Sequence, residues 1–111
     1  MSYWPGRRVT VTGGRGFLGR PLVEMLTQAG ADVSTFSSAD YDLTRQSDVA
    51  KLYHDQDPQV VIHLAARVGG IGANRDNPGK FFYDNAVMGI ELMEQGRKNG
   101  LAKFVTVGMG K

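Results

Sequence analysis

Residues 12–19 read Thr-Gly-Gly-Arg-Gly-Phe-Leu-Gly, and this stretch decides the fold. It directly follows Arg8–Thr12, a β-branched run that is typical of a strand. It also opens a helical pattern from Gly16 to Ala29, with Gly30 as the stop signal. The apolar residues of that pattern recur on one face, namely at Leu18, Leu22, Met25 and Leu26. Pro21 falls just past the position where a missing N–H costs nothing, so a distorted first helical turn is expected.

The spacing of the glycines predicts a chemical role for this turn. We expect Gly13 to make the turn, Gly16 to let the backbone approach a pyrophosphate, and Gly19 to let helix and strand pack closely. The amino terminus of the helix adds unpaired N–H groups and a partial positive charge, both of which favour phosphates. Gly accounts for 15 of the 111 residues, so the strand-turn-helix context carries the prediction more than the spacing does. A tight turn that holds no ligand is the alternative.

The rest of the chain alternates strands with helices. Further strands are predicted over residues 32–36, 60–64 and 103–107, and helices over 47–53, with Ser47 as N-cap, and 78–99, closed by Gly100. This alternation indicates right-handed crossovers and a parallel sheet. The predicted fold class is α/β, a Rossmann-type three-layer αβα arrangement with strand order 3-2-1-4. Residues 1–111 are expected to form one NAD(P)-binding domain that is incomplete, with the substrate domain absent.

Composition limits the classes of function. The chain is 41% hydrophobic and 22% charged, as in an ordinary globular domain, and 111 residues suffice for one core. The net charge of +2 comes from scattered basic residues, which weakly favours anionic ligands and does not indicate a nucleic-acid surface. Because there is no cysteine, disulfides, thiolate metal sites and a cysteine nucleophile are excluded, and no metal is expected. The cytoplasm is the expected compartment, and neither a targeting segment nor a membrane role is indicated.

The choice between NAD and NADP is predicted from the residues that end the second strand. An acidic side chain there would bind the ribose 2′-hydroxyl and exclude a 2′-phosphate. Ser37 and Ser38 follow Phe36 instead, so NADP is favoured while NAD stays open. Arg15 could supply the positive charge that NADP requires. A solvated loop arginine is an equally good interpretation of Arg15.

These motifs resemble those of the extended short-chain dehydrogenase/reductases, which act largely on nucleotide sugars. Residues 12–19 match the family's TGGxGFxG turn, Asp42-Leu43 is similar to its adenine-side acidic pair, and residues 63–66 are similar to its HLAA run. Asn85 with Gly89 resembles the NxxxG of its long helix. From the residues alone, His63 is better explained as a packed strand residue, and Asn85 is equally well explained as a polar helix residue.

The turn and the resemblance together define a set of candidate cofactor-binding residues. They are Gly13, Gly14, Arg15, Gly16, Phe17, Leu18, Gly19, Ser37, Ser38, Asp42, Leu43, Leu64, Ala65, Ala66 and Asn85. Residues 63–71, followed by Ala73-Asn74 and Asn77-Pro78, most resemble a branch of the family that epimerises and reduces a GDP-4-keto-6-deoxymannose with NADPH.

The catalytic residues that the resemblance implies are incomplete. The family uses a Ser or Thr after the fourth strand and a Tyr-x-x-x-Lys beyond it, in which the lysine lowers the tyrosine pKa. No serine follows Ser47, no tyrosine has a lysine four residues on, and Thr106 lies within the predicted strand. No catalytic residue is therefore assigned, and the chain alone is expected to be inactive. A non-catalytic NAD(P)-binding sensor or regulatory module is the alternative function.

The expected partners follow from the same resemblance. The complete enzyme would take a nucleotide-sugar substrate, whose identity the sequence does not specify. The predicted helix 78–99 carries more apolar surface than one sheet face needs to cover, so it is a candidate homodimer surface. Its apolar residues are Phe81, Phe82, Val87, Ile90, Leu92 and Met93.

Overall fold

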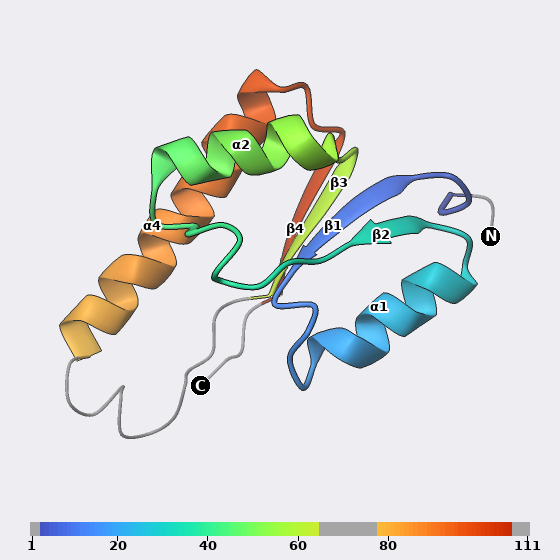
Figure 1. Ribbon diagram of the computed structural model, residues 1–111, viewed down its shortest axis with the longest axis horizontal. Helices are drawn as coiled ribbons and strands as arrows, with labels where there is room; N and C mark the ends of the chain where they lie inside the picture. The colour runs from blue at the N-terminus through green and yellow to red at the C-terminus, as the bar shows by residue number, and fades with distance from the viewer. Residues whose placement is uncertain (1–2, 65–77, 108–111) are drawn as a thin grey trace.

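A computed structural model describes residues 3–64 and 78–107 and contains seven regular elements (Figure 1). Four of them are strands, β1 (Arg8–Thr12), β2 (Asp32–Ser34), β3 (Val60–Leu64) and β4 (Lys103–Val107). Three are helices, α1 (Gly19–Gln28), α2 (Gln46–Gln56) and α4 (Pro78–Lys98). Helices lie on both faces of the sheet, so the predicted α/β class and three-layer αβα architecture are confirmed.

The four strands form one parallel sheet in the order β2-β1-β3-β4. The predicted order 3-2-1-4 is therefore wrong, because β3 pairs with β1 and not with β2. The physical reason lies in the burial of the strands. β2 pairs over only three residues and is largely accessible, which suits an edge, whereas the first four residues of β3 are all buried and need a neighbour on each side.

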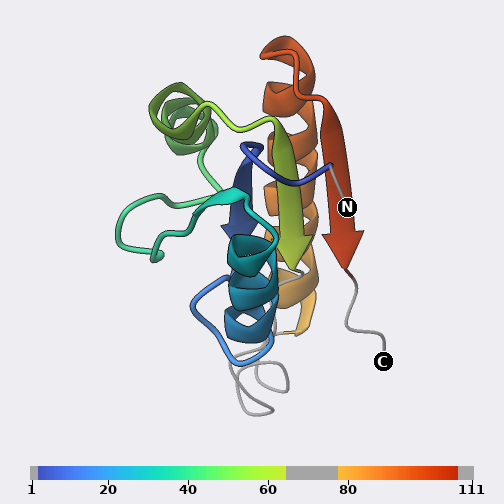
Figure 2. The ribbon, with the colours of Figure 1, turned by 90° about the vertical axis from the view of Figure 1, so that its right-hand side faces the viewer.

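The strand order decides which helix covers which face. The crossover through α1 steps from β1 outward to β2, whereas the crossovers through α2 and α4 step in the opposite direction, to β3 and β4. Because right-handed crossovers in opposite directions place their helices on opposite faces, α1 lies on one face and α2 with α4 on the other (Figures 1 and 2). The direction reverses between β1 and β3, which is the switch point where open α/β sheets bind ligands.

Each face of the sheet has its own hydrophobic core. Alternate residues of β1 and β3 point to α1 and pack with it, and this cluster contains Val9, Val11, Leu26, Ala31, Val60 and Ile62. The opposite cluster joins the sheet to α2 and α4 and contains Phe36, Leu43, Val49, Leu52, Tyr53, Val61 and Leu92. The period of two along the strands thus supplies both cores from the same segments.

The bounds of three elements differ from the prediction. α1 begins at Gly19 rather than Gly16, so Pro21 lies in the first turn, where its missing N–H breaks no helical hydrogen bond and no distortion is needed. α2 begins at Gln46, after an extended Arg45, and Ser47 is therefore inside the helix and is not its N-cap. β2 ends at Ser34, and Phe36 then leaves the sheet and enters the core against α2.

α2 and α4 are joined by a buried hydrogen bond. The hydroxyl of Tyr53 donates to the carbonyl oxygen of Leu92 at 2.7 Å. Gly96 lies one turn further along α4, where an added Cβ would come within 2.8 Å of the Tyr53 hydroxyl oxygen and 2.9 Å of Leu101 Cδ2. The absence of a side chain at Gly96 therefore allows the two helices and the following segment to approach.

Candidate functional site

The glycine turn leaves the carboxyl end of β1 in a tight, hydrogen-bonded loop. Gly13 adopts a φ of +74°, a conformation that residues with a Cβ rarely accept. The N–H of Gly16 donates to the carbonyl oxygen of Gly13 at 3.1 Å, and the N–H of Arg20 donates to that of Gly16 at 3.1 Å. These bonds turn the chain from the strand into α1, as the spacing predicts.

The glycines of the turn have different surroundings. A Cβ at Gly14 would lie 2.6 Å from Thr35 Cγ2, and one at Gly19 would collide with the backbone of Gly13 and Gly14. A Cβ at Gly16 would meet only the Gly13 carbonyl oxygen, at 3.4 Å. Gly14 and Gly19 are therefore required by the fold itself. At Gly16 the backbone is open to a neighbour from outside, as a pyrophosphate site requires, so the turn fits a dinucleotide.

The amino terminus of α1 is electrostatically suited to an anion. Leu18 is the N-cap residue and makes no side-chain capping bond, and the first turn contains no acidic residue. The N–H groups and the positive end of the helix dipole are thus neither capped nor neutralised by side chains. Phe17 next to it is 91% exposed, and Leu18 is 49% exposed. This exposed end can accept the phosphates of a ligand.

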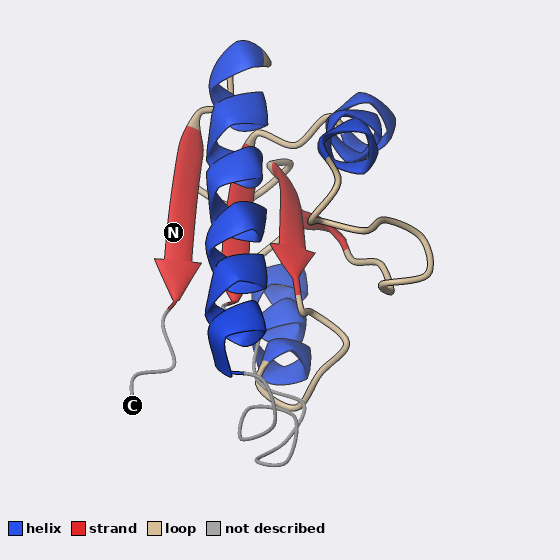
Figure 3. Ribbon diagram, turned by 90° about the vertical axis from the view of Figure 1, so that its left-hand side faces the viewer, coloured by secondary structure: helices blue, strands red, loops and turns tan. Residues whose placement is uncertain are grey.

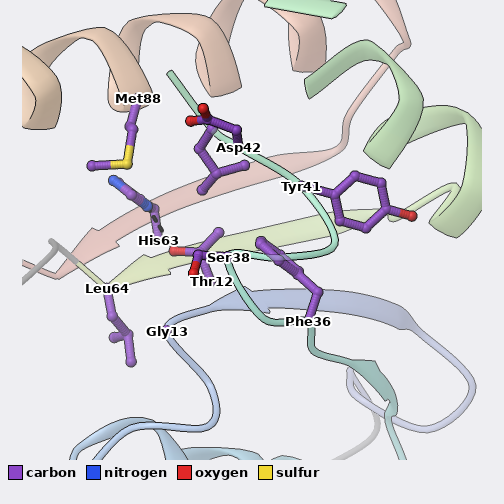
Figure 4. Close-up of a pocket in the computed structure, with 10 residues that line it drawn as sticks. Thr12, Gly13, Phe36, Ser38, Tyr41, Asp42, His63, Leu64 and Met88 are labelled. Atoms are coloured by element: carbon purple, nitrogen blue, oxygen red, sulfur yellow. Dashed lines mark hydrogen bonds between the residues drawn. The ribbon is translucent and has the colours of Figure 1, made fainter. Parts of the chain in front are cut away.

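A pocket of about 460 Å³ opens at the switch point between β1 and β3 (Figure 4). Its walls come from the carboxyl ends of these strands, from the loop after β2, and from α4. The lining residues are Thr12, Gly13, Phe36, Ser38, Tyr41, Asp42, Leu43, His63, Leu64 and Met88. The mixture of apolar walls with a few polar groups is what a small-molecule site requires.

Thr12 and His63 form a buried polar pair at the floor of this pocket. The parallel register places them side by side, and Thr12 Oγ1 lies 2.7 Å from His63 Nδ1. Burial lowers the pKa of His63 below its usual value, and its ring stacks on Phe104 with centroids 6.4 Å apart. A neutral imidazole satisfied by Thr12 holds the ends of β1 and β3 together beneath the pocket.

The loop after β2 contributes both apolar and acidic groups. The hydroxyl of Tyr41 donates to Asp55 at 2.6 Å, and this bond is the main reason that the pKa of Tyr41 is raised to about 12. Asp42 accepts from the hydroxyl and the N–H of Thr44, at 2.6 and 3.0 Å, which lowers the pKa of its carboxyl. Leu43 is buried in the core behind it. Asp42 is therefore ionised and held in place at the mouth of the pocket.

The structure brings together part of the predicted set of residues. Five predicted residues line the pocket, namely Gly13, Ser38, Asp42, Leu43 and Leu64. Six others continue the turn from Gly14 to Gly19 toward α1, Ser37 precedes Ser38, and Asn85 lies half-buried on α4 outside the pocket lining. Ala65 and Ala66 lie outside the described residues.

Five pocket residues were not in the predicted set. They are Thr12, Phe36, Tyr41, His63 and Met88. Three of them had a signal in the sequence, because Thr12 and Phe36 end predicted strands and His63 is next to the end of one, and strand ends of a parallel sheet meet at one edge. Met88 and Tyr41 carry no such local signal, since only packing of α4 and of the loop brings them to the pocket.

Two other features of the described residues bear on function. Within residues 3–64 and 78–107 there is no cluster of three or more potential metal ligands. Over the same ranges, none of the helices combines the length and the apolar character that crossing a membrane requires.

Known proteins resemble this chain in sequence and in fold. The model of the NAD dependent epimerase/dehydratase family matches residues 9–109. A GDP-L-fucose synthase of Sinorhizobium fredii is 34% identical over 108 residues, which are 97% of this chain and 34% of that protein. A GDP-L-fucose synthase of Azorhizobium caulinodans is 38% identical over 88 residues, or 79% of this chain and 28% of that protein.

A solved structure also resembles this chain in fold and in sequence. MlghC, a GDP-mannoheptose C4 reductase from Campylobacter jejuni with NADP bound, has a TM-score of 0.81 and 25% identity to this chain. The match covers 91% of this chain and 32% of that one. The chain spans about a third of the length of the curated relatives that it matches.

Proposed function

The chain belongs to the NAD dependent epimerase/dehydratase family, and from that premise we propose that it is the dinucleotide-binding portion of a nucleotide-sugar oxidoreductase or epimerase. The complete protein would resemble GDP-L-fucose synthase, the name that the relatives from Sinorhizobium fredii and Azorhizobium caulinodans carry. The reaction we propose for it is the NADPH-dependent epimerisation and reduction of GDP-4-keto-6-deoxymannose. When bound, the nicotinamide cofactor would supply the hydride, and the sugar nucleotide would be the substrate.

The proposed cofactor lies across the carboxyl ends of the strands. Its pyrophosphate meets the backbone of the turn from Gly13 to Gly19 and the amino terminus of α1. Its adenosine half enters the pocket beside Ser38 and Asp42, with Leu43 and Leu64 as apolar walls. Arg15 and Ser37 lie on the ribose side, next to the end of β2. Asn85 on α4 also belongs to the proposed set, as do Ala65 and Ala66, which lie outside the described residues.

The observation that carries this proposal is the glycine turn at the switch point of the sheet. The backbone at Gly16 is open while Gly14 and Gly19 are closely packed, and the positive end of α1 faces the same side. NADP is the proposed cofactor, since MlghC is a relative in fold that has NADP bound. NAD remains the alternative.

Cofactor binding to the isolated chain tests the proposal. NADPH should bind with a measurable calorimetric signal and should raise the melting temperature, because a ligand that binds only the native state stabilises it. At a hundred times the Kd the stabilisation would be about 2.7 kcal/mol. A melting temperature that does not change with saturating NADPH or NADH would contradict the proposal.

A non-catalytic NAD(P)-binding sensor is the second candidate, since the glycine turn and the pocket account for binding of a dinucleotide by themselves. Assaying the complete protein for turnover of a GDP-4-keto sugar distinguishes the sensor from the oxidoreductase or epimerase. Tight NADPH binding without turnover would favour the sensor.

We also propose that α4 forms a homodimer surface. Tyr83, Ile90 and Met93 are 68%, 62% and 57% exposed and follow one another along the side of α4 that faces away from the core. Leu92, by contrast, is fully buried against α2 and contributes nothing to that surface. An apolar stripe of this kind on a long surface helix is typical of a helix that packs against a second copy.

A further inference from the structure

Half of the residues that line the pocket come from one irregular segment, residues 35–45, which connects β2 to α2. They are Phe36, Ser38, Tyr41, Asp42 and Leu43. Phe36 and Leu43 are anchored in the core between the sheet and α2. Tyr41 and Asp42 lie between these two anchors in the sequence. Since the remaining lining residues belong to or adjoin regular elements, the position of this segment sets the width of the pocket.

Helix α2 holds the middle of the segment through two hydrogen bonds. The hydroxyl of Tyr41 donates to Asp55 Oδ2 at 2.6 Å, and the N–H of Asp42 donates to Asp48 Oδ2 at 2.7 Å. Asp48 and Asp55 are seven residues apart on α2, so they project from the same side of the helix. Two carboxylates of one helix face thus bind two consecutive residues of the pocket wall.

The ring of Tyr41 connects the bond to Asp55 with the pocket itself. It packs edge-on against Phe36, with the ring centroids 5.3 Å apart and the planes at 89°. Its hydroxyl points away from the other labelled residues, and Met88 lies on the opposite side of the pocket (Figure 4). Asp42, the next residue, carries the carboxylate at the pocket mouth. The bond between Tyr41 and Asp55 therefore fixes an apolar wall and the adjacent acidic group from outside the pocket.

We infer that Tyr41 and Asp55 are positioning residues of the proposed dinucleotide site, and that their hydrogen bond holds residues 35–45 in the conformation that receives the adenosine half of the cofactor. This inference rests on the proposed function. A segment that is already ordered before binding loses less conformational entropy when the ligand arrives, so the ligand binds more tightly. Because NADP and NAD share the adenine ring, the effect is expected for both.

The inference is tested by calorimetric titration of NADPH, and separately of NADH, into the wild-type chain and Tyr41→Phe. Phenylalanine keeps the ring against Phe36 and removes only the hydroxyl. We expect both Kd values to rise about fivefold, the scale of one hydrogen bond. Asp55→Ala should have the same effect as Tyr41→Phe. Asp55→Asn keeps an oxygen that can accept from Tyr41, so it should restore most of the wild-type affinity.

A double variant and a matched control show whether the bond itself is responsible. Tyr41→Phe/Asp55→Ala should bind no more weakly than either single variant, because both substitutions remove the same bond. Asp57→Asn removes a carboxylate that directly follows α2 and pairs with Arg8 at 3.4 Å, at the opposite end of β1 from the pocket. Asparagine also accepts the φ of +46° found at Asp57, and this variant should leave both Kd values unchanged.

Hydrogen exchange at the N–H of Asp42, followed by NMR, measures the order of the segment directly. In Tyr41→Phe without ligand this N–H should exchange faster than in the wild type, because the neighbouring bond that holds the segment to α2 is lost. Saturating NADPH should restore its protection. The N–H groups of β1 should exchange alike in both proteins, which a general loss of stability would not produce.

The outcomes separate the two proposals. An unchanged Kd in Tyr41→Phe, an equal loss of affinity in Asp57→Asn, or unchanged exchange at Asp42 would overturn the positioning role while leaving the dinucleotide site intact. A double variant whose loss equals the product of the two single losses would show that Tyr41 and Asp55 act separately, and would overturn the role of their bond. Failure of the wild type and of every variant to bind either cofactor would overturn the proposed function itself.

Discussion

Gly16 differs from Gly14 and Gly19 because one side of its backbone is open, and in the proposed site this side meets the pyrophosphate of the ligand. A Cβ there meets only one oxygen, at 3.4 Å, whereas one at Gly19 collides with two backbone segments. Gly16→Val should therefore fold but weaken NADPH binding by at least about tenfold, or about 1.4 kcal/mol, since the side chain would keep the pyrophosphate from the backbone. Fluorescence titration and the melting temperature measure the two effects.

Gly89→Val is the control for this substitution, because a Cβ at Gly89 meets nothing within 4 Å and lies on α4. It should leave the NADPH affinity unchanged. Equal losses in both variants, or a Gly16→Val protein that binds as the wild type does, would contradict the assigned role of the turn.

His63 predicts how stability depends on pH. Its pKa is lowered in the folded protein by burial, from the ordinary value of 6.5, so the unfolded chain binds the proton more readily. The neutral imidazole's contribution to the free energy of unfolding is fully present above the ordinary pKa of 6.5. This contribution is lost as the pH falls below 6.5 toward the lower pKa of the folded state. The free energy of unfolding should therefore decrease on acidification through this window. His63→Asn, whose amide oxygen can still accept from Thr12, should show a weaker decrease.

Urea unfolding at about pH 7.5 and about pH 5.5 checks this dependence, with His54→Asn as the control. His54 is the only other histidine, and it is exposed on α2. His54→Asn should keep the wild-type decrease. A wild-type stability that rises on acidification through this window would contradict the interpretation.

At the scale of elements, the packing of α2 against α4 depends on the absence of a side chain at Gly96. Gly96→Ala would force a Cβ against the Tyr53 hydroxyl and Leu101 and disturb the bond to Leu92. The free energy of unfolding should drop by about 1–3 kcal/mol, as overpacking in a core does. Gly89→Ala, on the same helix, should instead be neutral or stabilising by up to about 1 kcal/mol. Denaturant unfolding measures the free energy of unfolding of both variants. An equal change in Gly96→Ala and Gly89→Ala would contradict the close packing of α2 against α4 at Gly96.

The elements also show what the sequence could predict locally. β1, β3, β4 and the extent of α4 agree with the sequence pattern to within a residue, because apolar periodicity and terminal glycines are local signals. The start of α1 and the length of β2 were wrong for a shared reason. In both places the chain leaves a regular element to make the site, and tertiary contacts, such as that of Gly14 with Thr35, outweigh the local pattern.

At the scale of the whole molecule, α4 presents the surface that would meet a second copy (Figure 3). Ile90→Glu places a charge in the middle of the exposed apolar stripe and should shift the protein toward monomers, because an unpaired charge is costly in an apolar interface. Light scattering at several concentrations measures the mass. Met25→Glu, the same kind of change at a 66% exposed position on α1, should have no effect. A wild-type protein that is monomeric at all concentrations would contradict the proposed surface.

The strand order is the clearest case in which sequence alone was insufficient. A right-handed crossover can step to either side of β1, and the local sequence of residues 46–56 is compatible with both. Only the assembled sheet makes the choice, by placing the buried β3 between two strands and the short, accessible β2 at an edge. That choice also places β3, and not β4, next to β1 at the switch point, so the strand that forms the second wall of the pocket follows only from the tertiary structure.

The sequence by itself determined the kind of site, since the glycine turn between a strand and a helix is local chemistry that a few residues encode. The tertiary structure alone decided which residues share that site. It paired Thr12 with His63 through the register of two strands 51 positions apart, and it brought Met88 of α4 to the same pocket. Such contacts depend on the path of the backbone between the residues and not on the residues themselves, so the spacing of letters does not reveal them.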